Sequence, residues 1–248
     1  MARATSEKSQ RMRERMSLHL PVRVQGRDSI DHEWTEMSRL VDVTPFGARL
    51  RLKRPTEIGR LMLLVLAMPR QLRCFDHVED QYRVWSLVRN VKLLDPKSAS
   101  GALVEIGVAF VGKRPPQSYA ADPSRRYQIA KAVTDANLWS VTEDSGAQLS
   151  EFTADKRRET RHSIPIEVMI EVFDQKGELS IREKSVTENI NQYGAALFTS
   201  LDISPGRFVK MSSEHRNISV LAVVRAHRTA ADGIPRLHLE FIGSQWPL

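Results

Sequence analysis

The sequence has few cysteines and no long hydrophobic run. Cys74 is the single cysteine among 248 residues, so no disulfide can form within the chain, as is usual in a reducing cytoplasm. The longest apolar run, Leu61 to Met68, ends at Pro69 and is much shorter than the roughly 20 residues of a membrane-spanning helix. Residues 1–20 are polar and basic, without the apolar stretch of a signal peptide. We therefore expect a cytoplasmic protein without a transmembrane segment.

The sequence also lacks the common signatures of catalysis. It contains no glycine-rich phosphate loop, no Gly-x-Ser-x-Gly elbow and no Cys-His pattern. None of its seven histidines pairs with a carboxylate or cysteine at metal-ligand spacing. A polar cluster at Asp76, His77, Glu79 and Asp80 is better interpreted as a solvated loop than as a cation site. We expect no enzymatic activity, no metal and no cofactor.

The composition is that of a globular protein with an anionic partner. Hydrophobic residues make up 41% and charged residues 27%, which is sufficient to build a core. The net charge of +7 favours an anionic ligand without identifying it. A chain of 248 residues accommodates one large domain or two of about 100 to 150 residues each.

One constellation of residues occurs twice and indicates two domains. The first copy reads Arg11-x-x-x-Arg15, then Pro21, then Asp42-x-Thr44-x-x-Gly47. The second copy reads Arg157-x-x-x-Arg161, then Pro165, then Asn189-x-Asn191-x-x-Gly194. The arginine pairs lie 146 residues apart and the glycines 147, so the internal spacing agrees to within one residue. Duplication of a domain is the simplest explanation.

Alternation of apolar and polar residues predicts β-strands in both halves. Short strands separated by Gly, Pro or Asn are typical of an antiparallel barrel or sandwich. The alternating apolar sets are Ala48, Leu50 and Leu52; Val104, Ile106, Val108 and Phe110; Val220, Ala222, Val224 and Ala226; and Leu237, Leu239 and Phe241.

Between the halves the period changes. Asp122 followed by Pro123 is a helix-start signal, and apolar residues then recur at near-helical spacing. We predict one helix from Pro123 to Trp139, followed by a polar joint over residues 142–150.

The repeated residues are suited to binding a guanine nucleotide. Guanidinium groups donate forked hydrogen bonds to phosphate or to the O6/N7 edge of guanine, and they stack on bases. An Asp or Asn on a tight turn meets a base edge, and a glycine there permits a positive φ or a close approach of the backbone.

At these residues the chain resembles the PilZ domain family, whose pattern is RxxxR followed by [D/N]-x-S-x-x-G on a six-stranded barrel. The segments Ile106–Phe110 and Leu237–Phe241 resemble the closing strand of that family. The resemblance implies a mainly β protein: a basic arm (1–10), PilZ-like domain 1 (11–116), a helical linker (117–150) and PilZ-like domain 2 (151–248). It also implies that the chain binds the bacterial second messenger cyclic di-GMP and acts on a downstream protein partner, in motility or biofilm regulation.

The resemblance assigns a role to each motif residue. Arg11, Arg15, Arg157 and Arg161 would grip phosphates and guanine faces. Asp42 and Asn189 would meet a guanine edge, while Gly47 and Gly194 shape the turn. The position of the family's serine is Thr44 in one copy and Asn191 in the other, and both are candidate ligand contacts.

Two other functions remain open at this point. The serine replacements suggest a degenerate PilZ scaffold that acts as a protein-interaction adaptor without binding a nucleotide. The basic charge suggests a nucleic-acid-binding module. That alternative ranks third, because Trp34, Trp85, Trp139 and Trp246 are scattered and form no evident stacking platform.

Overall fold

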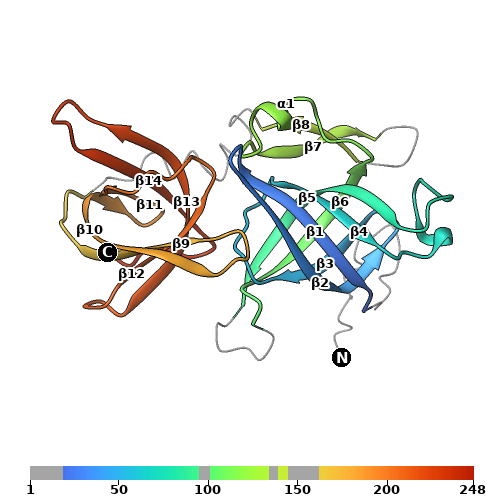
Figure 1. Ribbon diagram of the computed structural model, residues 1–248, viewed down its shortest axis with the longest axis horizontal. Helices are drawn as coiled ribbons and strands as arrows, with labels where there is room; N and C mark the ends of the chain where they lie inside the picture. The colour runs from blue at the N-terminus through green and yellow to red at the C-terminus, as the bar shows by residue number, and fades with distance from the viewer. Residues whose placement is uncertain (1–18, 95–100, 134–138, 145–161) are drawn as a thin grey trace, which may run out of the picture.

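The structure is a computed structural model that describes residues 19–94, 101–133, 139–144 and 162–248. Each half of the chain forms a closed six-stranded antiparallel barrel, and a small two-stranded sheet lies against the first barrel (Figure 1). Barrel 1 contains β1 (Pro21–Ser29), β2 (His32–Thr44), β3 (Gly47–Leu52), β4 (Leu61–Leu66), β5 (Tyr82–Leu93) and β6 (Val104–Gly112). Barrel 2 contains β9 (Glu167–Phe173), β10 (Leu179–Asn191), β11 (Gly194–Phe198), β12 (Phe208–Ser213), β13 (Ile218–Thr229) and β14 (Pro235–Ile242).

The two barrels have the same topology. Barrel 1 has the strand order β1-β2-β3-β6-β5-β4, and barrel 2, read from β9, has the order β9-β10-β11-β14-β13-β12. Each strand of one barrel therefore has a counterpart in the other. The predicted fold class is confirmed for both halves, as is the duplication indicated by the motifs.

The predicted alternating faces form the barrel cores, with one exception. Leu50 and Ile106 are fully buried in barrel 1, as is Leu237 in barrel 2. Each such side chain contributes about 1.5–3 kcal/mol through loss of water contact. Ala226 departs from the pattern because the register of β13 against β14 shifts between Val224 and Ala226. This β-bulge changes the face on which the following residues lie.

The predicted linker helix from Pro123 to Trp139 is wrong. The helix in this region is the four-residue α1 (Ser118–Ala121), followed by strands β7 (Tyr127–Val133) and β8 (Trp139–Glu143), which pair as an antiparallel hairpin. Asp122 does not cap a helix; its carboxylate accepts a hydrogen bond from the backbone N–H of Ser124 at 3.0 Å.

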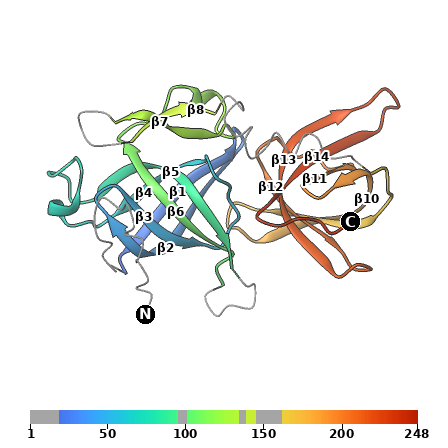
Figure 2. The same ribbon diagram turned by 180° about the vertical axis from the view of Figure 1, so that it is seen from behind.

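The hairpin lies along the outer surface of barrel 1, as Figure 2 shows from behind. Tyr127 and Tyr119 are buried with Leu61 and Leu87, and Ile129 packs against this cluster. This explains the continuous apolar run at β4, because both faces of that strand are covered. Packing against the outer surface of β4 and β5 therefore determines that this segment forms strands, although the spacing of its apolar residues is near-helical.

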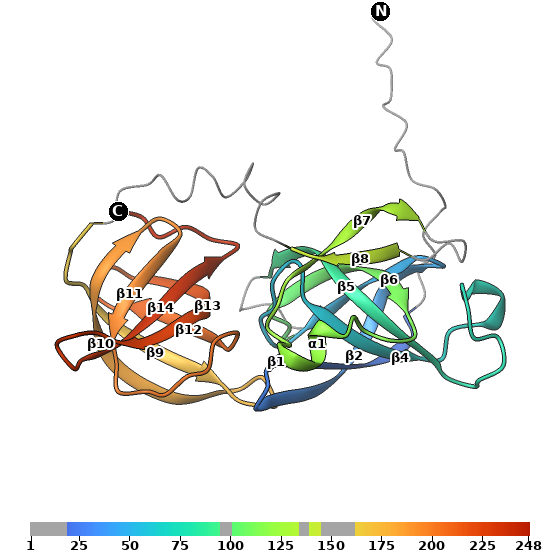
Figure 3. The same ribbon diagram turned by 90° about the horizontal axis from the view of Figure 1, so that it is seen from above.

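The barrels lie side by side in Figure 3 and share an apolar contact. Phe173, Phe208, Leu221, Val223 and Ile242 of barrel 2 form a buried cluster against which Leu93 and Leu103 of barrel 1 pack. At the edge of this contact Gly206 has a φ of +92°, and a Cβ there would lie 2.1 Å from the carbonyl oxygen of Asp28. The barrels approach each other so closely at this point that only glycine fits.

We predict that Gly206→Ala weakens the contact between the barrels. Gly233→Ala is the matched control, because Gly233 also has a positive φ (+75°) but has no atom near the added Cβ. Both variants lose about 1 kcal/mol through left-handed strain. Only Gly206→Ala should enlarge the radius of gyration in small-angle X-ray scattering. Equal radii for the two variants would contradict this interface.

Candidate functional site

Both motifs occupy the same hairpin in their respective barrels. Asp42 and Thr44 end β2, and Gly47 begins β3; Asn189 and Asn191 end β10, and Gly194 begins β11. In the register of each hairpin Thr44 pairs with Gly47, and Asn191 pairs with Gly194, so two residues form each turn. The motif residues of each copy that lie within the described chain are therefore brought together.

The residues at the position of the family's serine stabilise the turns through side-chain hydrogen bonds. The hydroxyl of Thr44 accepts a hydrogen bond from the N–H of Phe46 at 3.2 Å and donates one to the carbonyl of Gly47 at 3.3 Å. The side-chain oxygen of Asn191 accepts hydrogen bonds from the N–H groups of Tyr193 and Gly194, both at 2.9 Å. Asx and ST turns of this kind replace backbone hydrogen bonds in tight turns. Thr44 and Asn191 thus have a structural role in addition to the predicted contact with ligand.

The two glycines are required by close approach and not by backbone conformation. Neither Gly47 nor Gly194 has a positive φ. A Cβ at Gly47 would lie 2.3 Å from the carbonyl oxygen of Val108, and one at Gly194 would lie 2.4 Å from that of Leu239. Of the two reasons proposed for glycine here, the close approach of β6 and β14 is the correct one.

On the outer face of barrel 1, the motif carboxylate is paired with a neighbouring arginine. Asp42 lies opposite Arg49 on β3, with 2.6 Å between Oδ2 and Nη2, and its side chain is 8% exposed. Arg49 also contacts Glu105 of β6 at 3.3 Å, and Glu105 in turn accepts a hydrogen bond from Arg51 at 3.0 Å. The sequence analysis missed Arg49 and Glu105.

The corresponding face of barrel 2 has a different chemistry. Asn189 lies opposite Ala196 and makes a long hydrogen bond of 3.4 Å to Glu188. Arg236 of β14 donates to Glu188 at 2.6 Å and stacks over the ring of Phe198 at 5.0 Å. Hydrogen bonds from Arg236 also hold the pKa of Asp232 well below its usual range.

The four motif arginines, Arg11, Arg15, Arg157 and Arg161, lie outside the described residues. The chain is described again from His162, immediately after Arg161, and this residue pairs with Ile190 through two backbone hydrogen bonds of 2.9 and 3.0 Å. Ile190 lies between Asn189 and Asn191. In barrel 1 the backbone N–H of Leu40 donates to the carbonyl of Leu20, so the first arm likewise leads to the motif strand. Leu20 and His162 thus both lie beside the strand that carries the Asx residue of their barrel.

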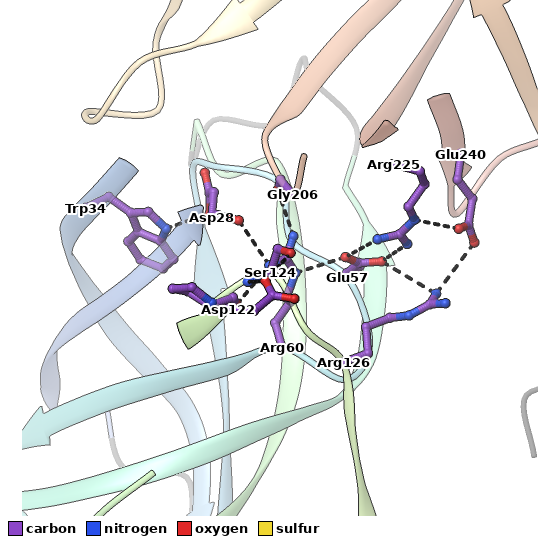
Figure 4. A network of polar contacts seen from close by, with 11 residues as sticks. Asp28, Trp34, Glu57, Arg60, Asp122, Ser124, Arg126, Gly206, Arg225 and Glu240 are labelled. Carbon is purple, nitrogen blue, oxygen red and sulfur yellow. Dashed lines mark hydrogen bonds and ion pairs between the residues drawn. The ribbon is translucent and has the colours of Figure 1, made fainter. Parts of the chain in front are cut away.

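A buried ion network joins the two barrels (Figure 4). Glu57 of barrel 1, whose side chain is 7% exposed, accepts hydrogen bonds from Arg60 at 2.9 Å and from Arg225 of barrel 2. Arg126 of the linker lies 3.8 Å from Glu57 and 3.7 Å from Glu240 of barrel 2. Arg225 follows Val224 at the β-bulge and also bonds Glu240 at 2.8 Å. The sequence analysis did not identify this network.

The network shifts the ionisation of its carboxylate. Burial raises the pKa of Glu57, but the guanidinium groups of Arg225 and Arg60 outweigh this effect and bring the pKa to about 2. Arg60 additionally donates to the carbonyl of Gly206 at 2.7 Å, which ties barrel 1 to the close-approach point of barrel 2. Glu57 is thus an ionised, buried group whose partners come from three parts of the chain.

The described residues were also compared with the requirements of a metal site and of a membrane-spanning helix. Within the residues that the structure describes, no three His, Cys, Asp or Glu side chains are grouped closely enough to hold a metal ion. The loop at residues 76–80 is instead organised by Arg73, which donates to the carbonyls of Asp76, Glu79 and Asp80. The described part of the chain also contains no helix with the length and apolar character needed to cross a membrane.

A scan against protein-family models finds no match, and a search of curated proteins also finds none. Similar solved structures include the inhibitor of motility MotI/DgrA of Bacillus subtilis, with 14% identity, coverage of 92% of this chain and 90% of that chain, and a TM-score of 0.30. PlzA of Borreliella burgdorferi in complex with c-di-GMP has 11% identity, coverage of 95% and 89%, and a TM-score of 0.30. YcgR of Escherichia coli in complex with c-di-GMP has 11% identity, coverage of 91% and 76%, and a TM-score of 0.28.

These TM-scores are low, so the assignment depends on the chain's own features. Both halves close into the six-stranded barrel that the PilZ resemblance implies. Each barrel carries its Asx-x-x-x-x-Gly motif on the same hairpin, which pairs with the strand that resembles the family's closing strand. The chain thus forms two barrels of equal topology, and the same hairpin of each barrel carries the motif by which the sequence resembles the PilZ family.

Proposed function

We propose that this chain is a cytoplasmic receptor for cyclic di-GMP that has no enzymatic activity and relays the signal to a protein partner by conformational change. The observation that carries the proposal is the pairing of His162 with Ile190. It brings the chain that follows Arg161 next to Asn189 and Asn191. We therefore expect the two parts of the motif, which are separated in the sequence, to converge on this hairpin.

The chemistry of this hairpin suits the ligand. Cyclic di-GMP carries two phosphates and two guanines. Arginine donates paired hydrogen bonds to phosphate oxygens and stacks on bases, so Arg157 and Arg161 suit the phosphates and the guanine faces. The amide of Asn189 offers both a donor and an acceptor to a base edge. Turn residues that are already fixed by Asn191 reduce the entropy that ligand binding would otherwise cost.

The relay follows from the connectivity of the chain. Residues 145–161 connect β8, on the linker hairpin of barrel 1, to His162, which pairs with the motif strand of barrel 2. A ligand that engages Arg157 and Arg161 therefore acts on the segment that joins the barrels. It shifts their arrangement only by the difference between its affinities for the two states.

The contact between the barrels, including the ion network, opposes that shift with a free energy that can be compared with the free energy of ligand binding. With ligand at about 100 times its dissociation constant, binding supplies at most about 2.7 kcal/mol. Separation of the barrels exposes several large apolar side chains, each worth about 1.5–3 kcal/mol, and removes the partners of Glu57. We therefore propose that the ligand adjusts the docking of the barrels and does not separate them.

One observation favours the alternative, a PilZ-like adaptor that binds no nucleotide. Thr44 and Asn191 are both engaged in turn hydrogen bonds, and Asp42 is paired with Arg49. Under that alternative the barrels would dock on a motility or envelope assembly, and the motif hairpins would be structural only.

The first test is isothermal titration of cyclic di-GMP into the full-length chain. We expect micromolar or tighter binding to the wild type, lost in Arg161→Ala or in Arg15→Ala. Loss of binding in only one of the two variants identifies the barrel that binds the ligand. Absence of heat in the wild type, together with no displacement of a labelled ligand, would support the adaptor.

A second prediction concerns Glu57. Glu57→Gln removes the carboxylate that Arg60 and Arg225 share and leaves the buried Arg60 without its ion-pair partner, so it should cost about 3–5 kcal/mol in urea unfolding. Glu33→Gln is the control, because Glu33 pairs with Arg27 on the surface and should cost less than about 1 kcal/mol.

The cost of Glu57→Gln should also depend on pH. The pKa of Glu57 is lowered from 4.5 to about 2, so its contribution is complete above about pH 4.5 and is lost as the pH falls towards 2. The difference in stability between wild type and Glu57→Gln should shrink across that range. A difference that does not change with pH would show that the charge of Glu57 is unimportant.

A third prediction tests the relay by small-angle scattering with saturating ligand. Glu57→Gln penalises the docked arrangement, because separated barrels would return Arg60 and Arg225 to water. The ligand-induced change in the scattering curve should therefore be larger in Glu57→Gln than in the wild type. If saturating ligand changes neither curve, the barrels do not transmit the signal through their relative arrangement.

A further inference from the structure

The two motif faces differ at positions that are equivalent in strand register. In barrel 1 one row of side chains across three strands reads Asp42, Arg49 and Gly107. In barrel 2 the same row reads Asn189, Ala196 and His238. Directly opposed residues on neighbouring antiparallel strands point to the same side of the sheet. The residue opposite the motif Asx is thus a long cation in one barrel and a methyl group in the other.

In barrel 1 that cation, Arg49, forms an ion pair with the motif carboxylate of Asp42. Arg49 lies 2.6 Å from Asp42, which is short enough for a charge-assisted hydrogen bond. Glu105 holds the same guanidinium at 3.3 Å and is itself bonded by Arg51 at 3.0 Å. A guanine edge that approaches Asp42 must displace Arg49. Movement of this guanidinium would also disturb its contact with Glu105, whose side chain is only 12% exposed.

In barrel 2 the residue at the equivalent position, Ala196, is buried and provides no cation opposite Asn189. Ala196 carries no polar group, and Asn189 makes only a 3.4 Å hydrogen bond to Glu188 among the described residues. Glu188 has a stronger partner in Arg236, at 2.6 Å. An incoming base edge therefore exchanges one weak contact of Asn189 for hydrogen bonds of normal length. No ion pair has to be broken.

On the basis of the proposed function, we propose that the two motif faces are unequal: barrel 2 carries the working cyclic di-GMP site, and Arg49 closes the equivalent face of barrel 1. Arg49 acts as an internal competitor that takes the position of the ligand on Asp42. Barrel 1 then serves as the platform that docks barrel 2 through Glu57 and Arg60.

The test is the number of cyclic di-GMP molecules bound per full-length chain, measured by isothermal titration. The wild type and Asp42→Ala should bind the same number, whereas Asn189→Ala should lose affinity about tenfold or more. Arg49→Ala should bind more ligand molecules per chain than the wild type, because it opens the face of barrel 1. Arg51→Ala is the matched control: it removes a cation from the same face and leaves the pair Asp42 and Arg49 intact.

The outcomes separate this inference from the proposed function. If wild type binds but Asp42→Ala abolishes binding, or if Asn189→Ala binds as the wild type does, the ligand uses barrel 1 and the inference fails while the function stands. If Arg49→Ala and Arg51→Ala both retain the wild-type stoichiometry, Arg49 does not close a site. No binding by any variant overturns both. Thermal unfolding of each variant establishes that it is folded, and Arg161→Ala reports on barrel 2 without altering the hairpin.

Discussion

The buried carboxylate of Glu57 is the constraint on which the tandem arrangement depends. An ionised group at this depth is tolerated only when cations surround it, and here the cations come from its own loop, from the linker and from barrel 2. Each of these partners is fixed by a separate local feature. Arg225 lies at a β-bulge, and Arg126 comes immediately before the strand that begins the linker hairpin. The apolar cluster around Phe208 buries surface at the same contact, and the network adds directional ion pairs to it.

The motif hairpins illustrate how one scaffold holds two different chemistries. Their backbones are nearly equivalent, because each glycine is required by the carbonyl of a neighbouring strand and each turn is closed by the residue at the serine position. The outer face is less constrained, since a side chain there contributes little to the core. Arg49 and Ala196 are therefore both compatible with the fold, while they have opposite consequences for an incoming ligand. A duplicated domain can keep its barrel and still diverge in function.

The barrels were predictable because alternation over several strands is a strong local signal, and the repeated spacing confirmed it independently. The linker was not, because the spacing of Tyr127, Ala130 and Val133 suits a helix, whereas Tyr127 and Ile129 follow the period of a strand. The choice between them depends on Leu61 and Leu87, which face outward from another part of the chain. Likewise, the pairing of Asp42 with Arg49 depends on a register shift between Leu40 and Asp42 that leaves no mark in the sequence. In the sequence, Glu57 and Arg60 look like exposed charges, because their burial depends on barrel 2, which packs against them.

Hydrogen exchange of the full-length chain, with and without saturating cyclic di-GMP, tests the central claim most directly. We predict slower exchange of backbone amides in the β10–β11 hairpin and at His162, with the β2–β3 hairpin of barrel 1 unchanged. Protection of the barrel 1 hairpin alone, or no change at either hairpin, would contradict it.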